Sequence, residues 1–326
     1  MVLYGFSDSC VTALQVTTST LQKVNSTMIK VSAAVVAGAA VVWLVYRQPR
    51  RIISPQSRLV AITGCDSGVG YSAAIHCHQQ GFSVLAMVLS VDSKGAQVLT
   101  AIGKDSGRLE VLAVDVTKPE QVAAAVQQIT SWLDKDPPLV FHALMNNAGV
   151  MVFGETEWQT ERIISQQLDV NLGGSIRVAR LFAPVLRKYK GRIINVTSHC
   201  ATLPLPGLAV YAASKAGLQA WSDALRVEWA KYGITVISFI PGALFQQTQI
   251  LASQVQYAGE MKTAMTAEAA GFYGQYYHLY QMYLSGLGGG DPAAVVQNDA
   301  LYRSLDSALL DSKPYTHYHD TPWRYR

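Results

Sequence analysis

Tyr211 and Lys215 lie four residues apart in the stretch LAVYAASKAG (208–217), which is otherwise built mainly of alanine and other small residues. On a helix this spacing places both side chains on one face, one turn apart. A phenol with a pKa near 10 is a poor base at neutral pH, and a neighbouring ammonium group lowers that pKa because it favours the phenolate. The pair could therefore exchange a proton with a hydroxyl group that is being oxidised. A core tyrosine beside a solvated lysine has the same spacing, so the rest of the chain must distinguish the two.

Further polar groups stand where short apolar runs end. Ser198 closes the run GRIINVTS thirteen residues before Tyr211, and Asn171 lies in DVNLGG, within a stretch expected to be helical. Ligands of open α/β sheets bind at the carboxyl edge of the strands, so these groups are expected near Tyr211. Turn residues that end two other runs, and that we expect to line a cofactor, are Asn147, Ala148, Gly149, Pro241 and Gly242.

The stretch TGCDSGVG (63–70) joins an apolar run to an alanine-rich helical one. Its three glycines suit a tight turn, a close approach of the backbone to a pyrophosphate, and close packing of helix on strand, while the helix N-terminus attracts phosphate. In this context the loop predicts a dinucleotide site. The residues of the loop that we expect at this site are Thr63, Gly64, Asp66, Ser67, Gly68, Val69 and Gly70.

The type of nucleotide depends on the end of the second predicted strand, where an acidic residue would bind a ribose hydroxyl and an arginine would favour a 2′-phosphate. Met87 stands about where that acid is expected, and Asp92 and Lys94 follow further on. Asp66 in the glycine loop would repel a phosphate. We therefore predict NAD, with NADP as the alternative. Asp115, at the end of the third predicted strand, is placed to contact adenine or, alternatively, to cap a turn.

Short apolar runs alternate with helical stretches from residue 58 to residue 245. This alternation predicts an α/β fold, a doubly wound parallel sheet of the Rossmann type. Residues 246–326 differ, because they contain the tyrosine-rich stretch GFYGQYYHLYQMYLSG (271–286) and then a glycine-rich break. We expect this region to form a helical cap over an apolar substrate; plain packing and contact with a membrane surface are the alternatives.

The N-terminal part contains an uncharged stretch at 31–46, which Lys30 precedes and RQPRR follows. We predict an N-terminal segment at 1–27, a membrane-anchor helix at 28–46 and a linker at 47–57; a buried helix of a soluble domain is the alternative. Arginine flanks one side of the apolar stretch, which predicts a cytosolic catalytic domain, and a short anchor suits the thin membrane of the endoplasmic reticulum.

Composition excludes other classes of protein. Half of the residues are hydrophobic, 15% are charged, and the net charge of +4 comes from scattered basic residues, so nucleic acid is not an expected partner. The four cysteines form no metal-binding spacing with one another or with histidine, so no metal site is predicted. The helical stretches at 160–188 and 211–232 could form a homodimer, an expectation that rests on analogy with similar folds.

Taken together, TGCDSGVG, DVT, NNAG, DVN, Ser198, YAASK and PG occur in the order seen in the short-chain dehydrogenase/reductase family. The resemblance covers about 58–245 and implies a tetrad of Asn171, Ser198, Tyr211 and Lys215. It implies that Tyr211 is the acid/base, that Lys215 lowers its pKa and holds the cofactor ribose, and that Ser198 orients the substrate oxygen. Asn171 would position a relay water.

The glycine loop with the following tyrosine, TGCDSGVGY, more narrowly resembles the branch that contains retinol, 17β-hydroxysteroid and 3-hydroxybutyrate dehydrogenases. Members of that branch often carry an N-terminal membrane segment. The stretches GETEWQTERIISQQLDVN, INVTSHC and PWRYR resemble the Shroud family of insect enzymes, which is implicated in early steps of ecdysteroid synthesis from sterol. One departure is PGALFQQT, where Gln246 and Gln247 come before Thr248 and leave the carboxamide contact open.

These observations predict a membrane-anchored dehydrogenase that transfers a hydride between a nicotinamide cofactor and a hydrophobic alcohol or ketone, foremost a sterol or steroid. Retinol is the second expected substrate. A short hydroxy acid comes third, because no arginine lies in SHCATLPLPGLAVY to bind its carboxylate. A protein of another class, a non-catalytic scaffold that keeps the fold and the cofactor, would not need the four polar residues.

Overall fold

The structure is a computed structural model that describes residues 28, 30, 32–38, 51–135, 138–287 and 289–319. The chain divides into two units, Met1–Arg51 and Ile52–Arg326. The predicted N-terminal segment and most of the predicted anchor at 28–46 lie outside the described residues. Among the residues that are described, no helix has the length and hydropathy that crossing a bilayer requires.

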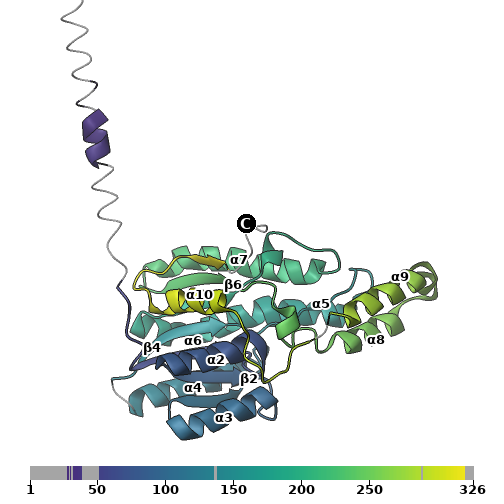
Figure 1. Ribbon diagram of the computed structural model, residues 1–326, viewed down its shortest axis with the longest axis horizontal. Coiled ribbons are helices and arrows are strands. Elements are labelled where there is room, and N and C mark those ends of the chain that lie inside the picture. Colours follow the sequence, from purple (N-terminus) through teal and green to yellow (C-terminus); the bar gives the residue numbers. More distant parts are fainter. Residues whose placement is uncertain are drawn as a thin grey trace, which may run out of the picture. The chain divides into compact units, whose positions relative to one another are not determined.

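The second unit is built on one parallel sheet of seven strands in the order β3-β2-β1-β4-β5-β6-β7 (Figure 1). The order reverses between β1 and β4, which is the switch point of a doubly wound sheet. The predicted α/β Rossmann-type fold is therefore confirmed. The strands are β1 (Arg58–Thr63), β2 (Ser83–Val88), β3 (Leu109–Ala113), β4 (Val140–Asn146), β5 (Arg192–Val196), β6 (Thr235–Ile240) and β7 (His317–His319).

Helices cover both faces of this sheet. Successive side chains of β1 point to opposite faces, so that Val60 and Ile62 join one apolar cluster and Leu59 and Ala61 join the other. The first cluster is closed by α2 (Gly68–Gln80), α3 (Lys94–Ser106) and α10 (Asp299–Leu310). The second is closed by α4 (Pro119–Lys135), α6 (Ser175–Tyr189) and α7 (Ala209–Ala230). Because both faces are covered, the central strands are mostly apolar rather than alternating.

The helical stretch predicted at 160–188 has an irregular centre. It consists of α5 (Glu161–Leu168), a π-helical turn (Asp169–Gly174) and α6. A side chain at Gly174 would place its Cβ 2.6 Å from Val116 Cγ2, so the turn passes very close to the end of β3. Single π-turns inside α-helices often occur at functional sites, and this one carries Asn171.

The C-terminal region does not all lie beyond the sheet. The pair of helices α8 (Gln254–Ala264) and α9 (Ala267–Ser285) projects to one side of the sheet in Figure 1. The following chain returns, α10 packs on the sheet, and β7 pairs with β6 through Ser238 and His317. The prediction assigned all of 246–326 to a cap and expected the alternation of strands and helices to end at residue 245. β7 has only three residues, HYH, which give no apolar pattern to detect.

Candidate active site

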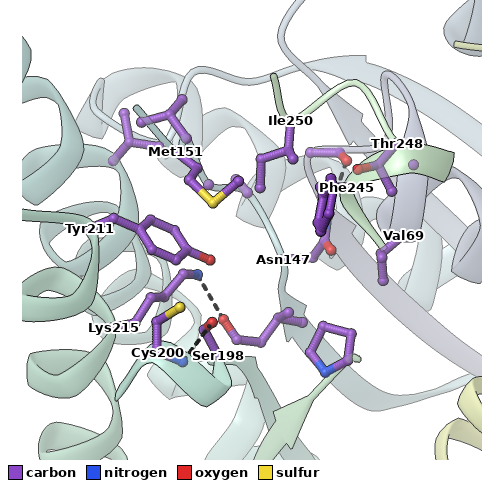
Figure 2. A pocket seen from close by; sticks show the side chains of 18 of the residues that line it. Val69, Asn147, Met151, Ser198, Cys200, Tyr211, Lys215, Phe245, Thr248 and Ile250 are labelled. Carbon is purple, nitrogen blue, oxygen red and sulfur yellow. Dashed lines mark hydrogen bonds between the residues drawn. The ribbon is translucent and has the colours of Figure 1, made fainter. Parts of the chain in front are cut away.

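Tyr211 and Lys215 occupy the first turns of α7, as the i, i+4 spacing predicted, and both point toward the carboxyl end of β5 (Figure 2). The Lys215 Nζ donates a hydrogen bond of 2.9 Å to the carbonyl of Val196 and lies 6.0 Å from the centre of the Tyr211 ring. Ser198 hydrogen bonds with the Tyr211 side chain. Its Oγ also accepts the Cys200 N–H at 3.1 Å. The structure therefore brings these three predicted residues together.

Burial controls the protonation of this pair. Desolvation raises the pKa of Tyr211 to about 12, and the hydrogen bond with Ser198 acts in the opposite direction. Desolvation also lowers the pKa of Lys215 to about 8. The pKa of Tyr211 thus moves opposite to the expected direction. The ammonium group favours the phenolate, but the cost of removing a phenolate from water outweighs this attraction, and the spacing alone does not reveal that cost.

Asn171 lies behind the wall of the site rather than in it. Its Oδ1 accepts the Val150 N–H at 2.7 Å, and its Nδ2 donates to the Val150 carbonyl and to Ser214 Oγ, both at 2.9 Å. The side chain is fully buried. It therefore ties the loop after β4 to α7, directly beside Gly149, whose missing Cβ would lie 3.4 Å from Lys215 Nζ. The relay-water role of Asn171 stays a prediction.

The glycine loop presents the N-terminus of α2 to the same cavity. Gly64 and Gly68 have φ values of 69° and 61°, which other residues rarely adopt. Ser67 precedes the helix without capping it through its side chain, so the first N–H groups of α2 have no side-chain acceptor. Such a helix start suits the pyrophosphate of a dinucleotide. The residues present therefore fit a dinucleotide of the NAD(P) type.

Thr63 and Asn147 join the two loops that flank the switch point. Thr63 Oγ1 accepts the N–H groups of Asn147 and Ala148, both at 2.9 Å. Asn147 Nδ2 returns hydrogen bonds to the carbonyls of Thr63 and Gly64, at 2.9 and 3.1 Å. Gly70 completes this contact, because a Cβ there would lie 2.3 Å from both Asn147 Nδ2 and Gly64 O. Thr63 and Gly70 hold the two loops from behind the cavity wall, whereas Asn147 both holds them and lines the cavity.

Two carboxylates lie along the part of the cavity that would receive the adenosine. Both oxygens of Asp66 are used, because they accept the N–H groups of Leu89 and Ser90 at 2.8 and 3.0 Å. Asp115 Oδ1 accepts from both the backbone and the hydroxyl of Thr117, which is the turn-capping role considered above. Asp66 and Asp115 nevertheless both line the cavity. Met87, at the position expected for an acid, is fully buried in the sheet.

A cavity of about 1160 Å³ connects these parts. The cavity wall includes the predicted residues except Thr63, Gly70 and Asn171, which lie behind it. Beyond Tyr211 the wall is mostly apolar. Sequence reasoning did not identify its members, because they come from loops without a motif. The apolar residues on this side are Met151, Phe153, Leu203, Leu205, Leu208, Phe245 and Ile250.

The tyrosine-rich helix α9 does not reach the cavity. It packs through Tyr277 and Tyr280 on Trp158, with ring centroids 4.9 and 5.5 Å apart. The Tyr280 hydroxyl lies against Gly207, since a Cβ added there would be 2.0 Å from it. Gly207 belongs to the loop that carries Leu203 and Leu205. Packing, one of the alternatives considered for this helix, therefore accounts for one of its sides.

Comparison with known proteins agrees with this geometry. Residues 58–257 match the family described as short chain dehydrogenase. The chain is 33% identical to D-beta-hydroxybutyrate dehydrogenase, mitochondrial, of Mus musculus, over 80% of this chain and 76% of that protein. It is 32% identical to 17-beta-hydroxysteroid dehydrogenase type 2 of Homo sapiens (84% and 69%). It is 34% identical to retinol dehydrogenase 16 of Rattus norvegicus (84% and 83%).

Solved structures show the same fold. A short-chain dehydrogenase from Streptomyces avermitilis superposes with a TM-score of 0.60 at 23% identity, covering 82% of this chain and 89% of that one. A gluconate 5-dehydrogenase from Burkholderia cenocepacia, solved with NADP and tartrate, gives 0.54 at 25% identity, covering 63% and 77%. The glycine loop, the Tyr211–Lys215 pair and these relatives agree with one another. They show that the chain belongs to the short-chain dehydrogenase/reductase family of NAD(P)-dependent oxidoreductases that act on CH–OH groups.

Proposed function

We propose that this protein transfers a hydride between NAD and a hydrophobic alcohol or ketone, foremost a sterol or steroid. The observation that carries the proposal is the apolar wall that begins directly beside the Tyr211 hydroxyl and continues through Phe153 and Leu208. An apolar cavity with a few polar groups at one end suits a rigid apolar molecule with one reacting oxygen.

In this proposal Tyr211 is the acid/base. Because burial keeps its hydroxyl protonated at neutral pH, Tyr211 is ready to donate a proton to a carbonyl oxygen that becomes a hydroxyl. In the reverse direction the same oxygen takes the proton of the alcohol, and the nearby Lys215 ammonium favours the phenolate that this step needs. Ser198 orients the substrate oxygen. Bound NAD(P) supplies or accepts the hydride.

The charge around the cavity favours an uncharged substrate over a hydroxy acid. Arg162 lines the cavity, but its Nε donates to both oxygens of Glu260 at 3.0 Å, and its Nη2 also contacts Glu260. Its charge is thus already neutralised. Steroid and retinol dehydrogenases among the relatives support the proposed substrate class, and the Shroud resemblance supports a sterol of the ecdysteroid pathway. Retinol is the second candidate.

The choice of NAD is supported by Asp66, whose carboxylate lies along the cavity where a 2′-phosphate would meet its negative charge. We also propose the N-terminal stretch at 28–46 as the anchor to the endoplasmic reticulum membrane, with the catalytic unit in the cytosol, and a homodimer as the assembly. The anchor is proposed from the sequence, and the homodimer from analogy with similar folds.

The function is tested by turnover of a panel of sterols, steroids, retinoids and 3-hydroxybutyrate with NAD and with NADP. We expect kcat/KM to be highest for a sterol or steroid with NAD. Tyr211→Phe is expected to lower kcat by about 10²–10⁴-fold. Tyr302→Phe is the matched control, because the Tyr302 hydroxyl bonds the Val296 carbonyl away from the cavity.

Three results would contradict parts of the proposal. Full activity of Tyr211→Phe would remove its catalytic role and favour the scaffold alternative. Turnover of retinol without turnover of any sterol or steroid would make retinol the substrate in place of a sterol or steroid. A preference for 3-hydroxybutyrate would overturn the argument from the Arg162–Glu260 pair.

A further inference from the structure

Helix α9 has three sides, and its packing on Trp158 accounts for only one of them. Tyr273, Tyr277 and Tyr280 face the cluster around Trp158. A second side carries the polar residues Gln275, His278 and Ser285, as expected toward water, together with the exposed Met282. The third side, here called the outer face of α9, consists of Phe272, Tyr276, Leu279 and Tyr283.

The outer face is apolar, aligned and exposed. Its members are spaced by three or four residues, so they form one stripe along the helix. Phe272 is 78% exposed, Leu279 55% and Tyr283 67%. Single exposed apolar side chains are ordinary, but an aligned aromatic stripe marks a contact surface. The helix that carries it has an intact N-cap, since Thr266 accepts the Ala269 N–H at 3.1 Å.

The outer face continues to the mouth of the cavity. The Tyr276 and Tyr280 rings are 6.0 Å apart, and the Tyr280 hydroxyl lies against Gly207. The loop of Gly207 carries Leu203 and Leu205, which line the cavity and are themselves 48% and 46% exposed. A path of mostly apolar side chains therefore leads from the exposed outer face of α9 to Leu203 and Leu205 in the cavity wall.

Charge decides between the possible occupants of this surface. The charged residue of α9 is Glu268 in its first turn, and no Asp, Glu, Lys or Arg occurs from residue 269 to residue 290. At the edge of the outer face, Glu157 accepts the Tyr273 hydroxyl at 2.6 Å, and Glu155 accepts that of Tyr276. A second copy docked by the same face would bring these carboxylates together with their counterparts, which is unfavourable. An uncharged lipid surface brings no second set of carboxylates to this face, and phenol rings suit its interface.

We propose that the outer face of α9 rests on the surface of a bilayer of uncharged lipids, so that the cavity mouth at Leu203 and Leu205 opens at the membrane. A hydrophobic substrate then enters from the lipid without crossing water. This contact is separate from the N-terminal stretch and brings the catalytic unit itself to the membrane. The entry route rests on the proposed substrate class, whereas the lipid contact does not.

The test uses the full chain with Cys10→Ser and either Leu279→Cys or Val227→Cys, labelled with a nitroxide and bound to phosphatidylcholine vesicles. Cys65, Cys77 and Cys200 are buried and resist labelling. Val227, on α7, is 78% exposed and apolar, which makes it a matched control at protein concentrations where the chain is monomeric, since 211–232 is one of the stretches expected to form the homodimer. At position 279 we expect collisions with oxygen to rise and collisions with a water-soluble nickel chelate to fall, each severalfold relative to position 227.

Equal accessibility to the nickel chelate at both sites, or no binding to vesicles, overturns the proposal. A short distance between two nitroxides at position 279 on different molecules also overturns it, because a second copy then covers the face. As a second measurement, Leu279→Lys should lower kcat/KM for a vesicle-borne substrate but not for a water-soluble alcohol, and Val227→Lys should change neither. The nitroxide result needs no turnover, so it stands or fails independently of the proposed function.

Discussion

At the residue scale, the site combines groups that are both removed from water. Tyr211 and Lys215 are buried. Burial raises the pKa of Tyr211 and lowers that of Lys215, and both shifts favour the neutral side chain. The lysine is the more costly of the two at neutral pH, because it must stay charged to assist the phenolate. Its Nζ has the Val196 carbonyl as an acceptor, which compensates only part of the lost hydration. Such strain at a functional site should be measurable as lost stability.

We predict that Lys215→Met makes the protein more stable at pH 7 and removes a pH dependence. The pKa of Lys215 is about 8 in the folded protein against a usual 10.5. Between these pH values the unfolded chain binds more protons, so the free energy of unfolding of the wild type rises from pH 8 to pH 10. The contribution is at most about 3 kcal/mol. Above pH 10 the raised pKa of Tyr211 acts in the opposite direction.

The measurement is urea unfolding at several pH values, with Lys104→Met, at an exposed lysine of α3, as the control. A wild type and a Lys215→Met variant with parallel pH profiles would contradict the prediction.

The residue types and spacing predicted which groups meet here, since Ser198, Tyr211 and Lys215 do come together. Spacing could not predict the direction of the tyrosine pKa, because burial depends on the loops that close over the site.

At the element scale, the loop between β1 and α2 and the loop after β4 act as one unit. Its glycines could be identified in the sequence because strand, loop and helix follow one another there. The apolar wall beyond Tyr211 could not, because Leu203, Leu205 and Ile250 come from connections that are fixed only by packing on distant elements. The same holds for the π-helical turn, whose sequence DVNLGG has no pattern that differs from an ordinary helix.

We predict that Gly70→Ala lowers the affinity for the nucleotide by at least about tenfold. The added Cβ would meet Gly64 O and Asn147 Nδ2, and therefore pushes the two loops apart. The matched control is Gly259→Ala in α8, where nothing lies within 4 Å; there alanine is expected to stabilise by about 0.5–1 kcal/mol. Nucleotide titration followed by tryptophan fluorescence measures the first effect. Unchanged nucleotide affinity in Gly70→Ala would show that the two loops can separate without weakening nucleotide binding, and would contradict the prediction.

At the scale of the whole molecule, the C-terminal part of the chain covers the amino ends of β4 and β5, at the end of the sheet opposite to the site. Buried Arg192, at the start of β5, donates to the carbonyls of Ala308 and Asp311 at 2.6 and 3.2 Å. His142 on β4 contacts the Leu309 carbonyl at 2.7 Å. A guanidinium group suits the C-terminus of α10. The sequence predicted the doubly wound core but not this closure, which pairs residues more than a hundred positions apart.

We predict that Arg192→Met lowers the free energy of unfolding by less than about 2 kcal/mol. Carbonyls at the end of α10 lose a charged donor, but the desolvation that lowers the pKa of Arg192 to about 10 is also removed and offsets part of this loss. The kcat should be unchanged, since the contact lies at the amino end of β5 and the cavity at its carboxyl end. Urea unfolding and steady-state kinetics check the two parts, with exposed Arg187→Met as the control. A loss of kcat without a loss of stability would place Arg192 in the catalytic unit instead.

The pairing of β7 with β6 also has a consequence during biosynthesis. Translation delivers β6 long before residues 317–319, so in the interval β6 is an unpaired edge whose residues from Val236 to Ile240 are buried in the finished protein. An unpaired apolar edge is a template for aggregation. Newly made chains should therefore need chaperones in this interval. A chain whose translation stops before residue 317 should aggregate or be degraded rather than accumulate as a partly active enzyme.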